Sequence, residues 1–406
     1  MKKIAFLLLL TMVGCASRQK QVWLTELKDA HNTDRKDVAR VYLDKKGCLY
    51  PEKNFYIPYK SFFKESQYKS TYKFKPDTGN LKSYFTDSIA EAKKLATSYG
   101  IASNQEAGAI FTQVQAKIQS DKISEIQQLL NASSSKTLLI LIHGFNDPNP
   151  SGDYQRMRDY IKTYKAGKDY IYLEVYWDGL TSNQGNPGTS KIWGAAQLNS
   201  SYEANAVRHL INGLSSTTKV RIITHSLGAS VGTGALFNTF SKWKCPKEFD
   251  YYGDMMSTPA PSQSDIRIGM IAPAIPGVAT FVDFNQRKDT RVNTTDTILP
   301  SKNNINTVVV GYKKTDYALY KGFMKKKRFL SKIAGATTLG SNAATDGVSE
   351  IDRVTKTILA LGYTPATNPI KAIDFEANTH FDKEHGLYYY MQNDQKLKQF
   401  LDKLLD

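Results

Sequence analysis

Cysteine is scarce in this chain of 406 residues, and long apolar segments and internal repeats are missing. The three cysteines, Cys15, Cys48 and Cys245, stand at a spacing that offers no metal site. The apolar segment "IAFLLLLTMV" near the N-terminus has ten residues, too few for a helix that spans a bilayer. These absences exclude a cysteine-ligated metal centre and an N-terminal membrane-spanning helix. The composition, with 41% hydrophobic and 23% charged residues, is that of a globular chain.

The N-terminus is ordered like a secretory signal, with Lys2 and Lys3 before the apolar segment and "VGCAS" directly after it. The small residue before Cys15 resembles a bacterial lipobox, which implies that the Cys15 thiol is acylated and that residues 1–14 are removed. Ala16, in place of an aspartate, resembles lipoproteins sent to the outer membrane. We therefore expect a lipid-anchored protein of the bacterial cell envelope, at the outer membrane and facing the periplasm. An ordinary cleaved signal with an incidental cysteine is the alternative.

The net charge of +16 favours anionic partners such as lipid headgroups or nucleic acid. Because an exported protein seldom meets nucleic acid, we predict a membrane partner and no nucleic acid. The segment "KGFMKKKRFLSK", residues 321–332, interleaves Phe and Met with basic residues and is a candidate membrane contact, or else a solvated helix face. If Cys15 is acylated, Cys48 and Cys245 remain, and an oxidising compartment would permit them to pair or to stay two buried thiols.

Residues 15–130 read as a basic, aromatic-rich accessory region. Its first part mixes lysine with Tyr and Phe and predicts short strands and turns. We read this part as a solvated β-rich face, or as a surface for anionic lipid or another envelope component. Further on, "DSIAEAKKLATSYG" predicts a helix capped by Asp87 and ended by Gly100, and apolar spacing over residues 111–130 predicts another helix. The polar stretch "NASSSK" marks the boundary to a second region, 131–406.

The second region alternates apolar strands with helices, which predicts a doubly wound, mostly parallel α/β sheet. Several strands are apolar on both faces, as expected where helices cover both sides. The candidate strands are "TLLILIHGF", "YIYLEVYW", "KVRIITHS", "IRIGMIAPA", "NTVVVGYK" and "IKAIDFEA", the last ending near Ala377. A helix ending near Leu214 and an apolar-striped C-terminal helix should pack on this sheet. Two long connections, 241–265 and 333–369, are typical of functional or mobile insertions.

The stretch "VRIITHSLGASVG" is typical of a nucleophile elbow, in which a buried strand turns sharply into a helix with a serine at the apex. The residues two before and two after Ser226 must be small, and Thr224 and Gly228 hold those places. The helix that begins after Ser226 would direct its free N–H groups toward a developing oxyanion. Ser226 is therefore the candidate nucleophile.

The strand in "LLILIHGFND" ends in His143-Gly144, which resembles the oxyanion loop of lipases and esterases. Gly144 would let the backbone come close to the serine. The expected oxyanion donors are the backbone N–H groups of Phe145 and Leu227. His143 and His225 belong to this loop and to the elbow, so we interpret them as structural.

On these two motifs the chain from about residue 136 onward resembles the α/β-hydrolase superfamily, most closely bacterial lipase- and esterase-like hydrolases of unassigned substrate. The resemblance implies an acid and then a histidine after the serine. Asp316 follows a strand before an "AL" pair and is the expected acid, with Asp283 as its rival. The expected general base is His385 in "HGLYYY", because His380 would lie too close to the end of the preceding strand.

The predicted function is a serine hydrolase that cleaves carboxylic ester, thioester or lipid substrates through a Ser226–His385–Asp316 triad and an acyl-enzyme. No metal or organic cofactor is expected. A catalytically inactive binding or scaffolding lipoprotein with the same fold is the alternative. Retention of every triad residue type argues against this alternative.

Overall fold

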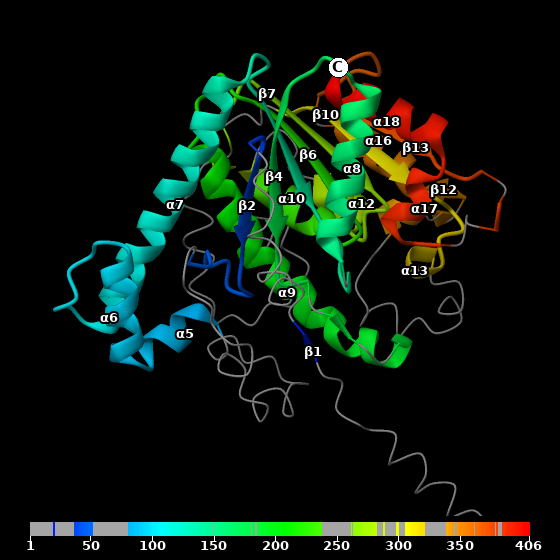
Figure 1. The fold of residues 1–406 in the computed structure, drawn as a ribbon. Helices are drawn as coiled ribbons and strands as arrows, with labels where there is room; N and C mark the ends of the chain where they lie inside the picture. The colour runs from blue at the N-terminus through cyan, green and yellow to red at the C-terminus, as the bar shows by residue number, and fades with distance from the viewer. Residues whose placement is uncertain are drawn as a thin grey trace, which may run out of the picture.

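The centre of the computed structural model is a seven-stranded sheet, and each strand pairing described in it is parallel (Figure 1). The structure describes residues 19–20, 36–51, 80–147, 149–179, 181–182, 185–237, 261, 263–281, 287–288, 298–299, 305–320, 338–342, 344–345, 347–360, 362–377, 379–380 and 384–406. In spatial order the strands of the sheet are β13 (Ile370–Asp374), β10 (Ile305–Tyr312), β7 (Asp265–Ile271), β6 (Lys219–His225), β3 (Thr137–Ile142), β4 (Tyr170–Tyr176) and β2 (Val38–Tyr42). The predicted α/β class with a parallel sheet is confirmed.

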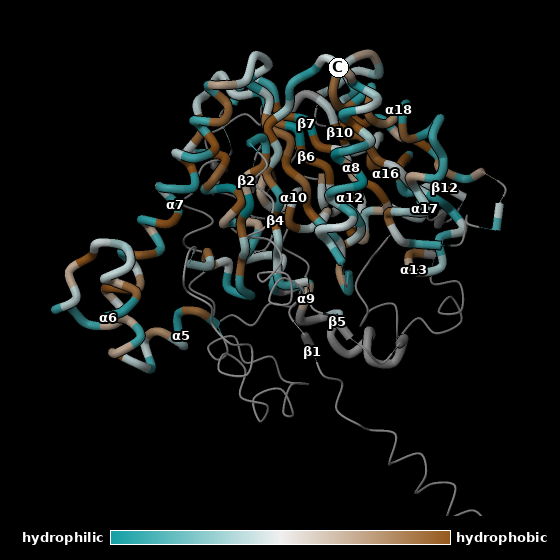
Figure 2. Tube along the Cα trace, in the orientation of Figure 1, coloured by the Kyte–Doolittle hydropathy of each residue, from teal (hydrophilic) through white to brown (hydrophobic). Residues whose placement is uncertain are grey.

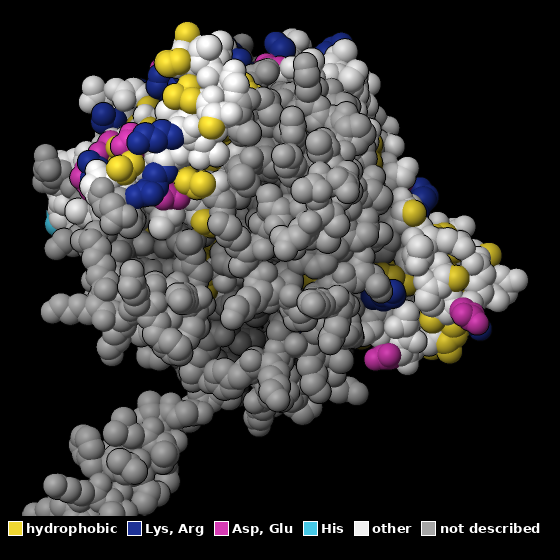
Figure 3. Space-filling model, turned by 180° about the vertical axis from the view of Figure 1, so that it is seen from behind, with side chains coloured by type: hydrophobic (Ala, Val, Ile, Leu, Met, Phe, Trp, Pro, Cys, Tyr) yellow, Lys and Arg dark blue, Asp and Glu magenta, His cyan; other side chains and the backbone are white. Residues whose placement is uncertain are grey.

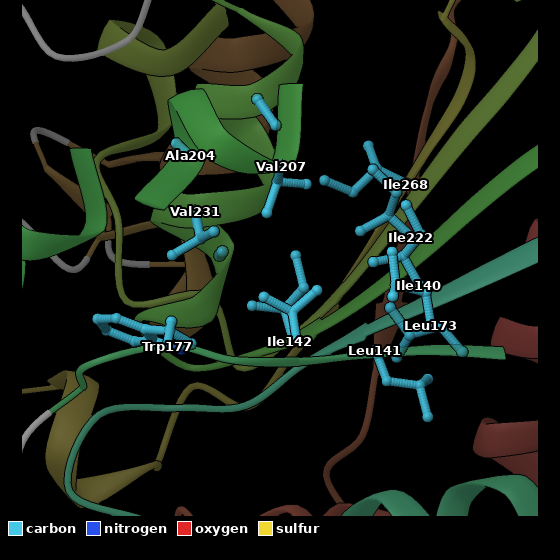
Figure 4. Close-up of a cluster of buried hydrophobic side chains, with 14 of the residues drawn as sticks. Ile140, Leu141, Ile142, Leu173, Trp177, Ala204, Val207, Ile222, Val231 and Ile268 are labelled. Atoms are coloured by element: carbon cyan, nitrogen blue, oxygen red, sulfur yellow. The ribbon is translucent and has the colours of Figure 1, made fainter. Parts of the chain in front are cut away.

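Helices cover both faces of this sheet. Ile140, Ile222 and Ile268 of β3, β6 and β7 face α9 (Gly185–Asn212) and α10 (Gly228–Leu236), whereas Leu141 points to the opposite face (Figure 4). On that opposite face α18 (Asp394–Leu405) packs against Gly269 of β7, where a side chain at position 269 would collide with the Phe400 ring. α8 (Pro150–Tyr164) lies on the same side as α18 (Figure 1).

The sheet forms because its strands are apolar on both faces. All residues of β3 and β4 are buried. Figure 2 shows that hydrophobic residues concentrate along the central strands of the sheet. α18 is apolar on one face only, and Asn393 caps its start by accepting a hydrogen bond from the Lys396 N–H. Burial of these apolar surfaces is the main stabilising contribution, at about 25 cal/mol per Å².

Part of the region 15–130 joins this sheet. β2 is the edge strand beside β4, and α7 (Ala107–Ala132) packs on both of these strands. α5 (Leu81–Thr86) and α6 (Ile89–Ser98) pack against the far end of α7, where the rings of Phe85 and Phe111 lie 6.0 Å apart. The helices predicted for residues 87–100 and 111–130 are confirmed, and most of the predicted β-rich face lies outside the described residues.

Two predicted details of the elements were wrong. Ser88, not Asp87, caps α6, because Ser88 is extended and its hydroxyl accepts from the Glu91 N–H, while Asp87 ends α5. β13 ends at Asp374 and not near Ala377, because the Asp374 carboxylate accepts from the Glu376 N–H and turns the chain.

The remaining elements are short, apart from one helix of 11 residues in the second long connection. They are β1 (Gln19–Lys20), β5 (Thr181–Ser182), α12 (Gly277–Phe281), β8 (Arg287–Lys288), β9 (Ile298–Leu299), α13 (Tyr317–Tyr320), α15 (Thr338–Ser341), β11 (Ala344–Thr345), β12 (Val348–Ser349), α16 (Glu350–Ala360) and α17 (Leu387–Met391). None of the helices in the described ranges is long and apolar enough to cross a membrane.

On the face seen in Figure 3, the Lys and Arg side chains of the described residues are interspersed with Asp and Glu. The basic segments that the sequence marks as candidate membrane contacts, above all 321–332, lie outside the described residues. The membrane contact of this segment therefore stays a prediction.

Candidate active site

Ser226 stands at the turn between β6 and α10, in the left-handed backbone region with a φ of 52°. Left-handed backbone is unfavourable for a serine, and the structure holds it through the backbone: the Ser226 N–H donates to the Ile271 carbonyl at 3.0 Å, and the Ser226 carbonyl accepts from the Ala274 N–H at 3.0 Å. The strain at Ser226 is therefore balanced by hydrogen bonds to the residues around the end of β7.

Small residues surround the turn, as the sequence predicted. A β-carbon at position 228 would collide with the His143 carbonyl, so only glycine fits there. Thr224 is larger than the glycine common at its place, but it faces Gly232, where a β-carbon would lie only 2.7 Å from the Thr224 methyl group. Gly232 thus makes the room that Thr224 takes.

The three predicted triad residues lie in one hydrogen-bonded chain. His385 Nε2 lies 2.7 Å from Ser226 Oγ, and His385 Nδ1 lies 2.8 Å from Asp316 Oδ2. A carboxylate can only accept, so Nδ1 carries the proton and Nε2 is left to accept from the serine hydroxyl. Ser226 and Asp316 are buried, whereas the His385 side chain is 18% exposed. The His385 imidazole, which lies between these two buried partners, is thus the most exposed side chain of the three.

Asp316 is held by four donors and has no exposed surface. Its Oδ1 accepts from the N–H groups of Ala318 at 3.0 Å and Leu319 at 3.3 Å, so the short helix α13 begins on this carboxylate. Its Oδ2 accepts from His385 and also from the Tyr390 hydroxyl at 2.9 Å. Burial, and after it the Asp316 charge, raises the pKa of Tyr390 well above its usual value. Tyr390 therefore stays a proton donor toward Asp316.

The contact of Tyr390 with the acid was missed at the sequence level. The Tyr390 hydroxyl donates to the acid, and the Lys313 ammonium lies 4.1 Å from the centre of the Tyr390 ring. The spacing of Tyr390, five residues after His385, was the signal that the sequence offered.

The loop after β3 lies against the serine. A β-carbon at Gly144 would stand 3.0 Å from the Ser226 Cβ and 2.9 Å from His225 Nδ1, so a glycine is required there. Within the described residues, the N–H groups of Phe145 and Leu227 donate to no protein acceptor, which leaves both expected oxyanion donors available. The phenyl ring of Phe145 packs edge-on against Trp193 of α9, with ring centres 4.9 Å apart.

His143 fixes this loop to the end of β4. Its Nε2 accepts from the Trp177 N–H at 3.2 Å, and its own carbonyl accepts from the Trp177 indole at 2.8 Å. Nδ1 donates to the Gly144 carbonyl, and burial lowers the pKa of His143 to about 4. His143 is therefore a neutral structural side chain at neutral pH, as its sequence position suggested.

Other candidate residues fall away from this cluster or outside the described residues. His380 is exposed and takes no part in the described triad contacts. Cys48 is half-buried, and burial, with the Asp44 carboxylate as the next cause, raises its pKa well above the usual value. Three further residues singled out in the sequence, Cys15, Cys245 and Asp283, lie outside the described residues.

The arrangement can activate a hydroxyl nucleophile, because a base and its orienting acid meet at Ser226, beside the loop of Phe145 and the start of α10. In the described part of the chain, no group of three or more His, Cys, Asp or Glu residues is placed to hold a metal ion. Neither a family model nor a curated protein matches this chain.

Proposed function

We propose that this protein is a serine hydrolase of the α/β-hydrolase type, which cleaves carboxylic esters, thioesters or lipid esters through an acyl-enzyme. The observation that carries the proposal is the continuous chain from Ser226 through His385 to Asp316, with contacts of 2.7 and 2.8 Å. The three residues come from a strand–helix turn and from two loops, each next to a different parallel strand. Their order along the chain, Ser then Asp then His, is that of the α/β hydrolases.

In the first half-reaction Ser226 Oγ attacks the substrate carbonyl carbon while His385 Nε2 takes the hydroxyl proton. Asp316 stabilises the imidazolium that forms, and the N–H groups of Phe145 and Leu227 are the donors for the oxyanion. Collapse of the tetrahedral intermediate breaks the bond to the leaving group, which leaves with the proton from Nε2. Ser226 then carries the acyl group.

In the second half-reaction a water molecule attacks the acyl-enzyme carbonyl, and Nε2 takes its proton. The second collapse breaks the bond to Ser226 Oγ and returns the proton to it, which releases the carboxylic acid. Both half-reactions use the same groups, so the loss of any one triad member should abolish both.

A fluorophosphonate probe tests the proposal, because it phosphonylates an activated serine and needs no knowledge of the substrate. We expect the wild type to react and Ser226→Ala to be inert. Ser230→Ala is the matched control: Ser230 is buried on α10, four residues further on, and receives its hydrogen bond from Ser200. No reaction of well-folded wild type would favour the binding or scaffolding lipoprotein instead.

Chromogenic esters of increasing acyl length, together with a thioester and an amide of the same acyl group, would define the substrate class. We expect esters and thioesters to be turned over and the amide to be a poor substrate. Cleavage of the amide alone would contradict the proposed esterase activity while leaving the serine hydrolase intact.

We further propose that the protein is anchored in the bacterial cell envelope by lipid on Cys15, at the outer membrane and facing the periplasm. The support is the short apolar segment that ends in "VGC". Radiolabelled palmitate should enter the wild type and not Cys15→Ser. Equal labelling of the two proteins would contradict the anchor and would not affect the proposed chemistry.

A further inference from the structure

His225 links three parts of the candidate active site. It is the last residue of β6 and the neighbour of Ser226, and its Nε2 lies 2.9 Å from the backbone carbonyl of His385. Its other ring nitrogen, Nδ1, faces Gly144 in the loop that carries Phe145. The His225 imidazole therefore contacts the loop that carries His385 and the loop that carries Phe145. Its own backbone belongs to β6, the strand that leads into Ser226.

The base needs such support because it stands on a loop. His385 lies between β13 and α17, and residues 384–386 belong to no helix or strand. Asp316 holds the imidazole at Nδ1, which fixes the direction of the ring. That bond does not fix the backbone from which the ring extends, whereas the bond from His225 does. Strand β6 is paired on both sides, so its end is a rigid point of attachment.

The neutral state of the His225 ring also suits its position beside the general base His385. The His385 carbonyl can only accept, so Nε2 of His225 carries a proton. Burial, and after it the neighbouring His385, lowers the pKa of His225 to about 3, so the ring is neutral at neutral pH. The two ring centres are 5.2 Å apart. A cation at that distance would oppose formation of the His385 imidazolium, and a neutral donor does not.

We infer that His225 is a positioning residue, which holds the backbone of the general base His385 in register with Ser226 by donating the Nε2 hydrogen bond. This inference rests on the proposed hydrolase function. It assigns to the residue before the nucleophile a role in the alignment of the base, beyond the structure of the turn. A misplacement of about 1 Å between reacting groups can cost roughly a hundredfold in rate, so the loss of this one bond should be measurable.

Two substitutions of equal length isolate the bond. His225→Gln keeps an N–H donor three bonds from Cβ, the same number of bonds that separates Nε2 from Cβ in histidine. His225→Met has the same length and no donor. We expect His225→Gln to keep kcat and the rate of fluorophosphonate labelling within a few-fold of wild type. We expect His225→Met to lose roughly a hundredfold in both, with KM little changed, because the bond acts on alignment and not on substrate binding.

Thermal unfolding of both variants separates positioning from folding. The inference requires that His225→Met remain folded, with its loss in kcat larger than that of His225→Gln at a similar unfolding temperature. Equal losses in the two variants, or wild-type kcat in His225→Met, would overturn the inference and leave the hydrolase intact. An unreactive wild type would overturn the proposed function itself, and the positioning role with it.

Discussion

Asp316 and Glu203 are two carboxyl groups of equal burial, each with no exposed surface, but their surroundings are opposite. Asp316 accepts hydrogen bonds from two backbone N–H groups, from His385 and from Tyr390. Glu203, on α9, accepts from the Asp178 N–H through one oxygen, and its other oxygen has no hydrogen-bond partner within the described structure. Burial, followed by the nearby Asp178 carboxyl, raises the pKa of Glu203 well above its usual value.

The difference teaches that burial does not decide what a carboxyl group does. Four donors support a negative charge at Asp316, which an orienting acid needs in order to stabilise an imidazolium. A single donor and an acidic neighbour favour the protonated, neutral form of Glu203. In this form the side chain can be buried without the cost of a charge. We therefore expect the two groups to respond in opposite ways to the same change from acid to amide.

Of the changes from acid to amide, Asp316→Asn should produce the largest effect. An amide in place of the carboxylate can donate to His385 Nδ1 and thereby leave the proton on Nε2, which then cannot accept from Ser226. The expected loss in kcat is about 10⁴, the size seen when an orienting aspartate of this kind becomes asparagine. The measurement is turnover of a chromogenic ester.

The matched control for this experiment is Glu203→Gln, which keeps an oxygen for the Asp178 N–H and should turn over at close to the wild-type rate. Asp283→Asn tests the rival acid and should lose far less than Asp316→Asn. If Asp283→Asn were the inactive variant, the acid of the triad would be misassigned.

Tyr390→Phe should have an intermediate effect, because it removes one of four donors to Asp316 and leaves the packing of the ring in place. A hydrogen bond to a charged group contributes about 1.5–3 kcal/mol, and we expect only part of this in the transition state, or roughly a tenfold loss in kcat. Tyr388→Phe is the control, since residue Tyr388 is 47% exposed. Equal kcat for the two variants would show that Tyr390 serves packing alone.

Glu203→Gln should change the way in which the free energy of unfolding depends on pH. A carboxyl group whose pKa is raised on folding contributes stability that is present below its unfolded pKa and is lost as the pH rises toward its folded pKa. The amide lacks this loss, so the variant should gain on wild type as the pH rises above the usual carboxyl pKa, by up to about 1.4 kcal/mol per pH unit.

Urea unfolding at pH 5, 6.5 and 8 measures this gain, with Glu106→Gln as the control, because Glu106 is exposed and its side chain makes no cap hydrogen bond to α7. His143 and His225 act with the opposite sign: their lowered pKa values cost stability as the pH falls below about 6.5. These two histidines are present in both proteins, so they cancel in the difference. A constant difference between wild type and Glu203→Gln across this range would show that Glu203 is not held neutral.

His380→Ala should have the smallest effect. His380 is exposed, whereas His385 holds both triad contacts. We expect kcat within a few-fold of wild type for His380→Ala and a loss of several orders of magnitude for His385→Ala. Activity in His385→Ala together with inactivity in His380→Ala would reverse the assignment of the base.

Local patterns in the sequence were sufficient to predict six of the seven strands of the central sheet and several of the helices that pack on it. Each of the six predicted strands is present, because runs of apolar residues on both faces can only be buried between two layers of helices. The ends of the elements were less predictable. Ser88 and Asp87 are both good helix caps, and only the backbone conformation of the folded chain decides which of them accepts the hydrogen bond.

The candidate site divides in the same way. Ser226 and Gly144 could be identified from the sequence because a sharp turn and a close backbone approach permit few residue types. The separation of His385 and Asp316 from their rivals depended on a family resemblance. The contacts of Tyr390, His225 and Glu203 were not predictable, because each joins residues more than 20 positions apart and none of them changes a local pattern.

The sequence by itself determined the alternation of strands and helices, the parallel sheet and the position of the turn at Ser226, because each of these follows from residues close together in the chain. Only the tertiary structure decided which histidine meets the serine, which side chains hold the acid and which buried carboxyl stays neutral. These outcomes depend on distances between atoms that the chain brings together from different strands. Hydrogen bonding and electrostatic interaction act through such distances, and the order of residues does not contain them.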